Sequence, residues 1–211
     1  MAHANDYDRI AGNYDAISRL FFQKAIVRSQ QSLFPFLSSP STVLIVGGGT
    51  GWILEEIAKI HSKGLHITYL DLSGKMIALA KKRDFKQNAV IFVQADIEEF
   101  ESRQQFDFII TPFLFDNFKP DRAASIFGRL DRLLSSSGLW LFADFHVQDN
   151  INGVWQKMVL KCMYLFFRIV SKVEASELTD MTMLFVLKKY ETVFESSHFF
   201  RFIQARVYRR N

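Results

Sequence analysis

Three glycines and one aspartate have the types and spacing of a nucleotide-binding turn: Gly47, Gly49, Gly51 and Asp71. Glycine lets the backbone turn tightly and approach a ligand where a Cβ atom would collide with it. Asp71 stands twenty residues beyond Gly51, where its carboxylate can accept hydrogen bonds from the hydroxyls of a ribose. No Lys-Ser or Lys-Thr pair closes the glycine run, which excludes a P-loop. These residues predict a site for a nucleoside-containing cofactor.

The elements around this turn must hold the glycines and the aspartate together. Residues 43–46 are apolar and mostly β-branched, which predicts a strand buried on both faces. A helix is expected over residues 52–61, and its N-terminus directs free N–H groups at whatever the turn holds. A second apolar run, residues 65–70, ends at Asp71, and Ser73 is the expected N-cap of a helix over residues 74–83. A third strand, residues 89–94, leads to Asp96.

Residues 43–55, 71–76 and 94–96 together resemble the class I S-adenosylmethionine-dependent methyltransferases, and residues 7–15 resemble the N-terminal cap helix of the ubiquinone/menaquinone-type members. The resemblance implies S-adenosyl-L-methionine as the cofactor, with Asp96 at the edge of its adenine. One position departs from the family, which usually carries Asp or Glu where this chain has Ile45. The implied cofactor-binding residues are Tyr14, Gly47, Gly48, Gly49, Asp71, Leu72, Met76, Asp96, Ile97 and Thr111. Two alternatives stay open: Tyr14 only packs its helix on the core, and Asp96 only caps a short helix.

The resemblance implies an α/β fold: a Rossmann-like, seven-stranded mixed sheet, mostly parallel with one antiparallel strand, and helices on both faces. We expect a single domain over residues 1–211, with cap helices in 1–37, a cofactor-binding core in 42–145, and substrate-side helices and the last two strands in 146–211. An amphipathic helix is expected near residues 24–36. Strands are expected over residues 106–111, 139–145, 190–194 and 202–208, and a turn over 135–138. The helix over residues 121–134 is expected to carry Arg122, Arg129 and Arg132 on its outer side.

Candidate catalytic residues follow the fourth and fifth predicted strands, because ligands of such sheets lie at the carboxyl ends of the strands. Asp116 and His146 are the predicted catalytic residues, and Asp144 is a further candidate; each could serve as a base if the acceptor arrives protonated. The aromatic residues Phe113, Phe115 and Phe145 favour a small apolar or aromatic methyl acceptor. No metal-ligand spacing is present, so no metal is expected.

The C-terminal third holds a wide apolar helical face between residues 155 and 170, opposite a basic stripe. Core packing is the ordinary reading of such a helix. The alternatives are a lid over an apolar substrate pocket, a contact with a second subunit in a homodimer, and peripheral contact with a membrane.

The composition of the 211-residue chain limits the kinds of partner that it is expected to bind. Residues 1–150 carry 16 basic and 17 acidic side chains, whereas residues 151–211 carry 10 and 5. The excess of basic over acidic side chains in residues 151–211 favours contact with an anionic substrate or a membrane surface. The alternative is that these side chains only form a solvated basic face. No basic stripe with interleaved aromatic residues predicts nucleic-acid binding. The single Cys162, the lack of a signal peptide and the lack of an apolar run of membrane-spanning length favour a cytoplasmic protein.

Two other functions fit the glycine turn. A nicotinamide-dependent oxidoreductase would use a similar turn and ribose acid, but the chain has no Tyr-x-x-x-Lys pair, and such an enzyme leaves Asp96 unexplained. A non-catalytic protein of the methyltransferase fold is the other alternative, and Ile45 favours it.

Overall fold

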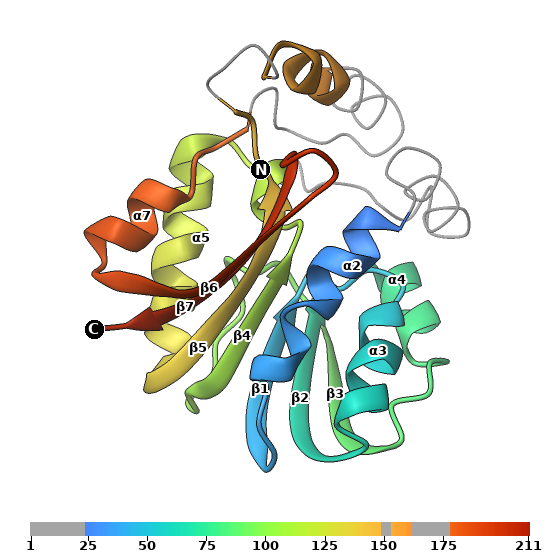
Figure 1. Cartoon of the computed structure of the whole chain (residues 1–211). Coiled ribbons are helices and arrows are strands. Elements are labelled where there is room, and N and C mark those ends of the chain that lie inside the picture. The colour runs from blue at the N-terminus through green and yellow to red at the C-terminus, as the bar shows by residue number, and fades with distance from the viewer. Residues whose placement is uncertain (1–23, 149–152, 162–177) are drawn as a thin grey trace.

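A computed structural model describes residues 24–148, 153–161 and 178–211, in which seven strands form one sheet of order β3-β2-β1-β4-β5-β7-β6 (Figure 1). The first five strands are parallel, β7 is antiparallel to β5, and β6 is antiparallel to β7. The predicted mixed sheet with one antiparallel strand is therefore confirmed. The strands are β1 Ser41–Val46, β2 Lys63–Asp71, β3 Gln87–Gln94, β4 Phe106–Pro112, β5 Leu134–Phe145, β6 Tyr190–His198 and β7 Ile203–Arg210.

Helices cover both faces of the sheet, because successive side chains of a buried strand point to opposite sides. Val43 and Ile45 pack with η2 Phe34–Phe36, α3 Trp52–Ile60 and α4 Gly74–Ala80 on one side, where α2 Ala25–Gln31 contacts α3, β6 and β7 (Figure 1). Leu44 and Val46 belong to the core on the other side, with α5 Pro120–Leu133 and α7 Thr182–Leu187. The short helix η3 Phe115–Asn117 follows β4. Residues 153–161 are also helical.

Several predicted boundaries are wrong, for local reasons. The helix expected over residues 24–36 is divided into α2 and η2, and Pro35, which has no N–H to donate, lies within η2. The turn expected over residues 135–138 is part of β5, which begins at Leu134 opposite Phe106. Leu139 already pairs with Phe108, so the intervening residues form an irregularity in the ladder rather than a turn between elements. The cap helix with Tyr14, and the predicted helix beyond residue 161, lie outside the described residues.

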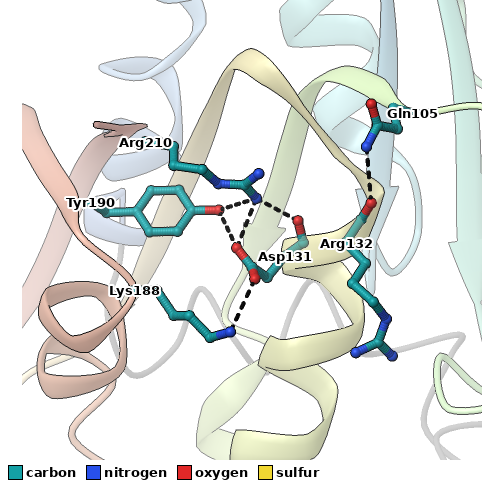
Figure 2. Close-up of polar contacts among 6 residues, drawn as sticks. All are labelled: Gln105, Asp131, Arg132, Lys188, Tyr190 and Arg210. Carbon is teal, nitrogen blue, oxygen red and sulfur yellow. Dashed lines mark hydrogen bonds and ion pairs between the residues drawn. The ribbon is translucent and has the colours of Figure 1, made fainter.

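A polar clamp of four residues, Asp131, Lys188, Tyr190 and Arg210, joins the end of α5 to β6 and β7 (Figure 2). The Asp131 carboxylate accepts from the Tyr190 hydroxyl at 2.8 Å and from Arg210 Nη2 at 2.7 Å, and Lys188 Nζ lies 3.4 Å away. Burial raises the pKa of Tyr190 to about 12, which keeps its hydroxyl protonated. The clamp lies at the amino end of β5, opposite the end at which the glycine turn follows β1.

No helix among residues 24–148, 153–161 and 178–211 has the length and apolar character needed to cross a membrane.

Candidate functional site

The glycine turn between β1 and α3 has a conformation that other residues adopt only with strain. Gly47, Gly49 and Gly51 have φ of +71°, +62° and +79°. Gly47 and Gly49 line a cavity at the carboxyl ends of the strands. A Cβ atom on Gly48 would lie 2.5 Å from the Tyr69 hydroxyl, so Gly48 packs against β2 and does not line this cavity.

Asp71 holds the turn in place from the end of β2. Its Oδ2 accepts from the Gly49 N–H at 3.1 Å, and its Oδ1 accepts from the Ser73 N–H at 2.9 Å. The Tyr69 hydroxyl donates to the Gly49 carbonyl at 2.9 Å. Ser73 caps α4 as predicted, since its Oγ accepts from the Met76 N–H at 3.1 Å. One carboxylate thus fixes both the glycine turn and the start of α4 beside the cavity.

Asp96, Arg122 and Phe118 form the other end of the same cavity. Asp96 Oδ1 accepts from the Glu98 N–H at 2.9 Å, so Asp96 caps the following turn and also lines the cavity. Arg122 Nη2 lies 3.1 Å from Asp96 Oδ2 and 2.7 Å from Glu98 Oε2, and its guanidinium stacks over the Phe118 ring at 5.1 Å. The prediction that Arg122 points outward is wrong, because these two carboxylates and the ring hold it inward, with 14% of the side chain exposed.

The cavity brings together most of the predicted cofactor residues: Gly47, Gly49, Asp71, Leu72, Met76, Asp96 and Ile97. Its wall also contains five residues of the stretch 111–118, which is expected to form one wall of the active site because ligands of open sheets bind where the strands end: Pro112, Phe113, Leu114, Asn117 and Phe118. The remaining residues of the wall, Val46, Leu70, Ala95 and Arg122, have no site role predicted from the sequence. The cavity is largely apolar and has carboxylates at two separate strand ends.

Thr111 is not in this wall, which corrects its predicted place. It is fully buried, and its Oγ1 accepts from Trp140 Nε1 at 2.9 Å, because residues alternate along β4 and Thr111 faces the core. Phe115 likewise packs in the core against Trp140 and Phe142 instead of lining an acceptor pocket. Ile45 is fully buried among apolar side chains on the α3 side of the sheet.

Asp144, which is buried, and Asp116, which is partly exposed, are neighbouring carboxyl groups beside the segment that follows β4. Asp144 is 2% exposed and accepts from the Phe115 N–H at 3.2 Å and the Phe145 N–H at 2.8 Å. Asn117 Nδ2 donates to Asp116 Oδ1 at 2.7 Å. Burial raises the pKa of Asp144 to about 7, and burial together with the neighbouring Asp144 charge raises the pKa of Asp116 well above its usual range. The pair therefore holds a proton close to neutral pH.

A second cavity lies at the carboxyl end of β5. Asp144, His146, Gln204 and Arg206 line it, together with Lys157 of the helical residues 153–161. His146 thus lies in the wall of this cavity and not in that of the first. The Phe113 ring of the first cavity contacts the Phe145 ring of the second, with centroids 5.0 Å apart. Within the described residues, no cluster of three or more potential ligands could hold a metal ion.

Comparison with known proteins gives a consistent set of matches. Residues 43–138 match the model of a methyltransferase domain. The chain is 30% identical to the malonyl-[acyl-carrier protein] O-methyltransferase of Priestia megaterium, over 72% of this chain and 52% of the relative. It is 33% identical to the ubiquinone/menaquinone biosynthesis C-methyltransferase of Bartonella henselae, over 71% of this chain and 62% of the relative.

The chain thus spans about half the length of the curated relatives it matches. Among solved structures, the fold is similar to that of magnesium protoporphyrin IX methyltransferase from Synechocystis PCC 6803 with bound S-adenosylhomocysteine. That similarity has a TM-score of 0.67 at 16% identity and covers 97% of each chain.

Proposed function

We propose, since the chain belongs to the class I S-adenosylmethionine-dependent methyltransferases, that it transfers a methyl group from S-adenosyl-L-methionine to a small acceptor with an apolar or aromatic body. The observation that carries this proposal is the first cavity. It joins the glycine turn and Asp71 at one strand end to Asp96 at another, which are the parts needed to hold an adenosine compound.

The residues of the first cavity fit this cofactor. Gly47 and Gly49 have no side chain and therefore leave room for the amino acid portion of the cofactor. A Cβ atom on Gly47 would occupy part of this room, since it would lie 3.2 Å from Leu114 Cδ1. Asp71 would accept hydrogen bonds from the ribose hydroxyls, and Asp96 from the exocyclic amine of the adenine. Leu72, Met76 and Ile97 offer apolar surface to the adenine ring.

The cofactor supplies an electrophilic methyl group on a sulfonium, so the chain must mainly position the acceptor and exclude water. The aromatic pair Phe113 and Phe145, between the two cavities, suits an apolar acceptor. An acceptor that arrives protonated must also lose a proton. We propose the Asp116–Asp144 pair as the base, because its raised pKa values let it take up a proton near neutral pH.

One observation favours a second function. Ile45 packs in the apolar core where the family carries an acid, so the methionine end of the cofactor lacks that contact. A non-catalytic protein that binds S-adenosylmethionine fits this feature. The names of the relatives leave the acceptor open, since one is a malonyl-[acyl-carrier protein] O-methyltransferase and another a C-methyltransferase of ubiquinone/menaquinone biosynthesis.

Calorimetric titration with S-adenosylhomocysteine and, separately, with NADH tests the proposal. We expect binding of the first compound only. Asp71→Ala should weaken this binding by about 1–3 kcal/mol, because its hydrogen-bond partners lose their acceptor. Asp84→Ala, an exposed change away from the cavity, is the control and should bind like the wild type. Unchanged affinity in Asp71→Ala, or preferential binding of NADH, would contradict the proposal.

A further inference from the structure

The second cavity contains a row of polar side chains that the pairing of β5 with β7 places on one face of the sheet. Asp144 lies directly opposite Gln204, and Phe142 lies opposite Arg206. Cross-strand partners in an antiparallel pair project from the same face, so Asp144, Gln204 and Arg206 lie together. All three line the cavity.

No hydrogen bond in the described part of the chain gives the side chain of Gln204 a structural role. Gln204 is 6% exposed and lines the cavity, and its side chain makes no hydrogen bond to any residue in the described part of the chain. Its amide is not among the fully enclosed polar groups, so it can reach a molecule in the cavity. Amides of buried residues in native structures nearly always have a partner in the protein, a water or a ligand. Its polar neighbours are already engaged. Arg206 contacts Glu195 at 3.0 Å and Thr182 Oγ1 at 2.9 Å, and Asp144 accepts from two backbone N–H groups.

The second cavity adjoins the first through shared structure. Phe113 of the first cavity packs on Phe145 of the second. Asp144, in the second cavity, accepts from the Phe115 N–H in the loop after β4, and the same loop supplies Phe113, Leu114 and Asn117 to the first cavity. A molecule in the second cavity would therefore lie beside the proposed cofactor site.

We propose that the second cavity binds the methyl acceptor, and that Gln204 selects an acceptor that carries a neutral hydroxyl group on an aromatic or apolar body. This inference rests on the proposed function. An amide can donate to a hydroxyl oxygen while the hydroxyl donates to a carboxylate, and Asp144 is the carboxylate opposite Gln204. Phe142, Phe145 and Met181 supply apolar walls.

The charges around the cavity favour a neutral ligand over an anion. Lys157, Arg206 and the titratable His146 lie in the wall, but Asp144 and Asp180 also line it, and Glu195 pairs with Arg206. The positive and negative charges are thus close to balance. The cavity volume of about 230 Å³ suits one or two fused rings, which makes 2-naphthol a suitable probe and 2-naphthoate its anionic counterpart.

The test measures binding of both probes to the full chain by ¹H–¹⁵N NMR, with S-adenosylhomocysteine binding measured on the same samples. We expect 2-naphthol to shift the amides of residues 142–147 and 203–207, and to bind at least tenfold more tightly than 2-naphthoate. Gln204→Leu should weaken 2-naphthol binding at least fivefold without lowering the melting temperature, because the native amide has no partner to lose. Gln87→Leu, an exposed glutamine-to-leucine change, is the matched control and should have no effect.

The inference would be overturned by amide shifts elsewhere or none, by equal or tighter binding of 2-naphthoate, by unchanged 2-naphthol affinity in Gln204→Leu, or by a lower melting temperature in that variant. Loss of S-adenosylhomocysteine binding in Gln204→Leu would also overturn it, because Gln204 would then act on the cofactor. Failure of the wild type to bind S-adenosylhomocysteine would instead contradict the proposed function, whatever the probes do.

Discussion

Asp144→Asn is expected to change how the stability of the protein depends on pH. The pKa of Asp144 is about 7 in the folded chain and about 3.9 in an unfolded one. Between these values the folded protein holds a proton that the unfolded chain releases, so stability falls as pH rises from about 4 to 7. Asparagine does not titrate, and the variant should lose this part of the dependence.

The magnitude follows from the size of the shift. About three pKa units at about 1.4 kcal/mol each give an upper limit of about 4 kcal/mol, and sharing of the proton with Asp116 reduces it. The interval from pH 5 to pH 8 covers about two of these three units, so relative to the wild type Asp144→Asn should be about 1–3 kcal/mol more favourable at pH 8 than at pH 5. The lost hydrogen bonds to Phe115 and Phe145 add a cost at both pH values and cancel in this comparison.

Urea unfolding of both proteins at pH 5 and pH 8 measures the difference directly. Asp84→Asn is the control. The pKa of exposed Asp84 is lowered by its hydrogen bonds with Lys86, so this group is ionised in both folded and unfolded chains across the range. Its effect should be the same at the two pH values. An equal stability change for Asp144→Asn at pH 5 and pH 8 would refute the argument that burial holds a proton on the carboxyl pair.

Two further predictions concern the cofactor cavity and its surroundings. Ile45→Asp should lower the free energy of unfolding by several kcal/mol, because it buries a carboxylate among apolar side chains. Ile45→Leu is the control. Unchanged stability of Ile45→Asp with tighter S-adenosylhomocysteine binding would show that a partner for the acid exists. Arg122→Leu removes the ion pair that holds Asp96 in place. Calorimetry should then show S-adenosylhomocysteine binding weakened by about 1–2 kcal/mol, because Asp96 is no longer fixed beside the adenine. Arg129→Leu on the same helix should not weaken this binding, and equal losses would contradict the role given to Arg122.

Local patterns in the sequence were sufficient for most of the strands and for the glycine end of the cavity, whereas the arrangement of the strands in one mixed sheet is implied by the family resemblance. The β-branched run before Gly47, Asp71 at the end of the next strand and the Ser73 cap are all short-range signals, and the structure has each in place. Such signals depend on neighbours along the chain, so they survive without knowledge of tertiary contacts.

The adenine end and the second cavity depend on contacts that a single segment does not encode. Arg122 turns inward because Asp96 and Glu98, from another loop, meet it. Thr111 faces the core and Trp140 because side chains alternate between the two faces of the sheet along β4. Gln204 faces Asp144 only through the β5–β7 register. Tyr14 lies outside the described residues, and its role stays a prediction.

We propose that the cavity between the glycine turn and Asp96 holds S-adenosylmethionine, and a crystal structure of the chain with S-adenosylhomocysteine would show whether it does. We expect the ribose at Asp71, the adenine at Asp96 and Ile97, and the amino acid portion at Gly47 and Gly49. A ligand bound elsewhere, or a glycine turn that makes no contact with it, would contradict the claim.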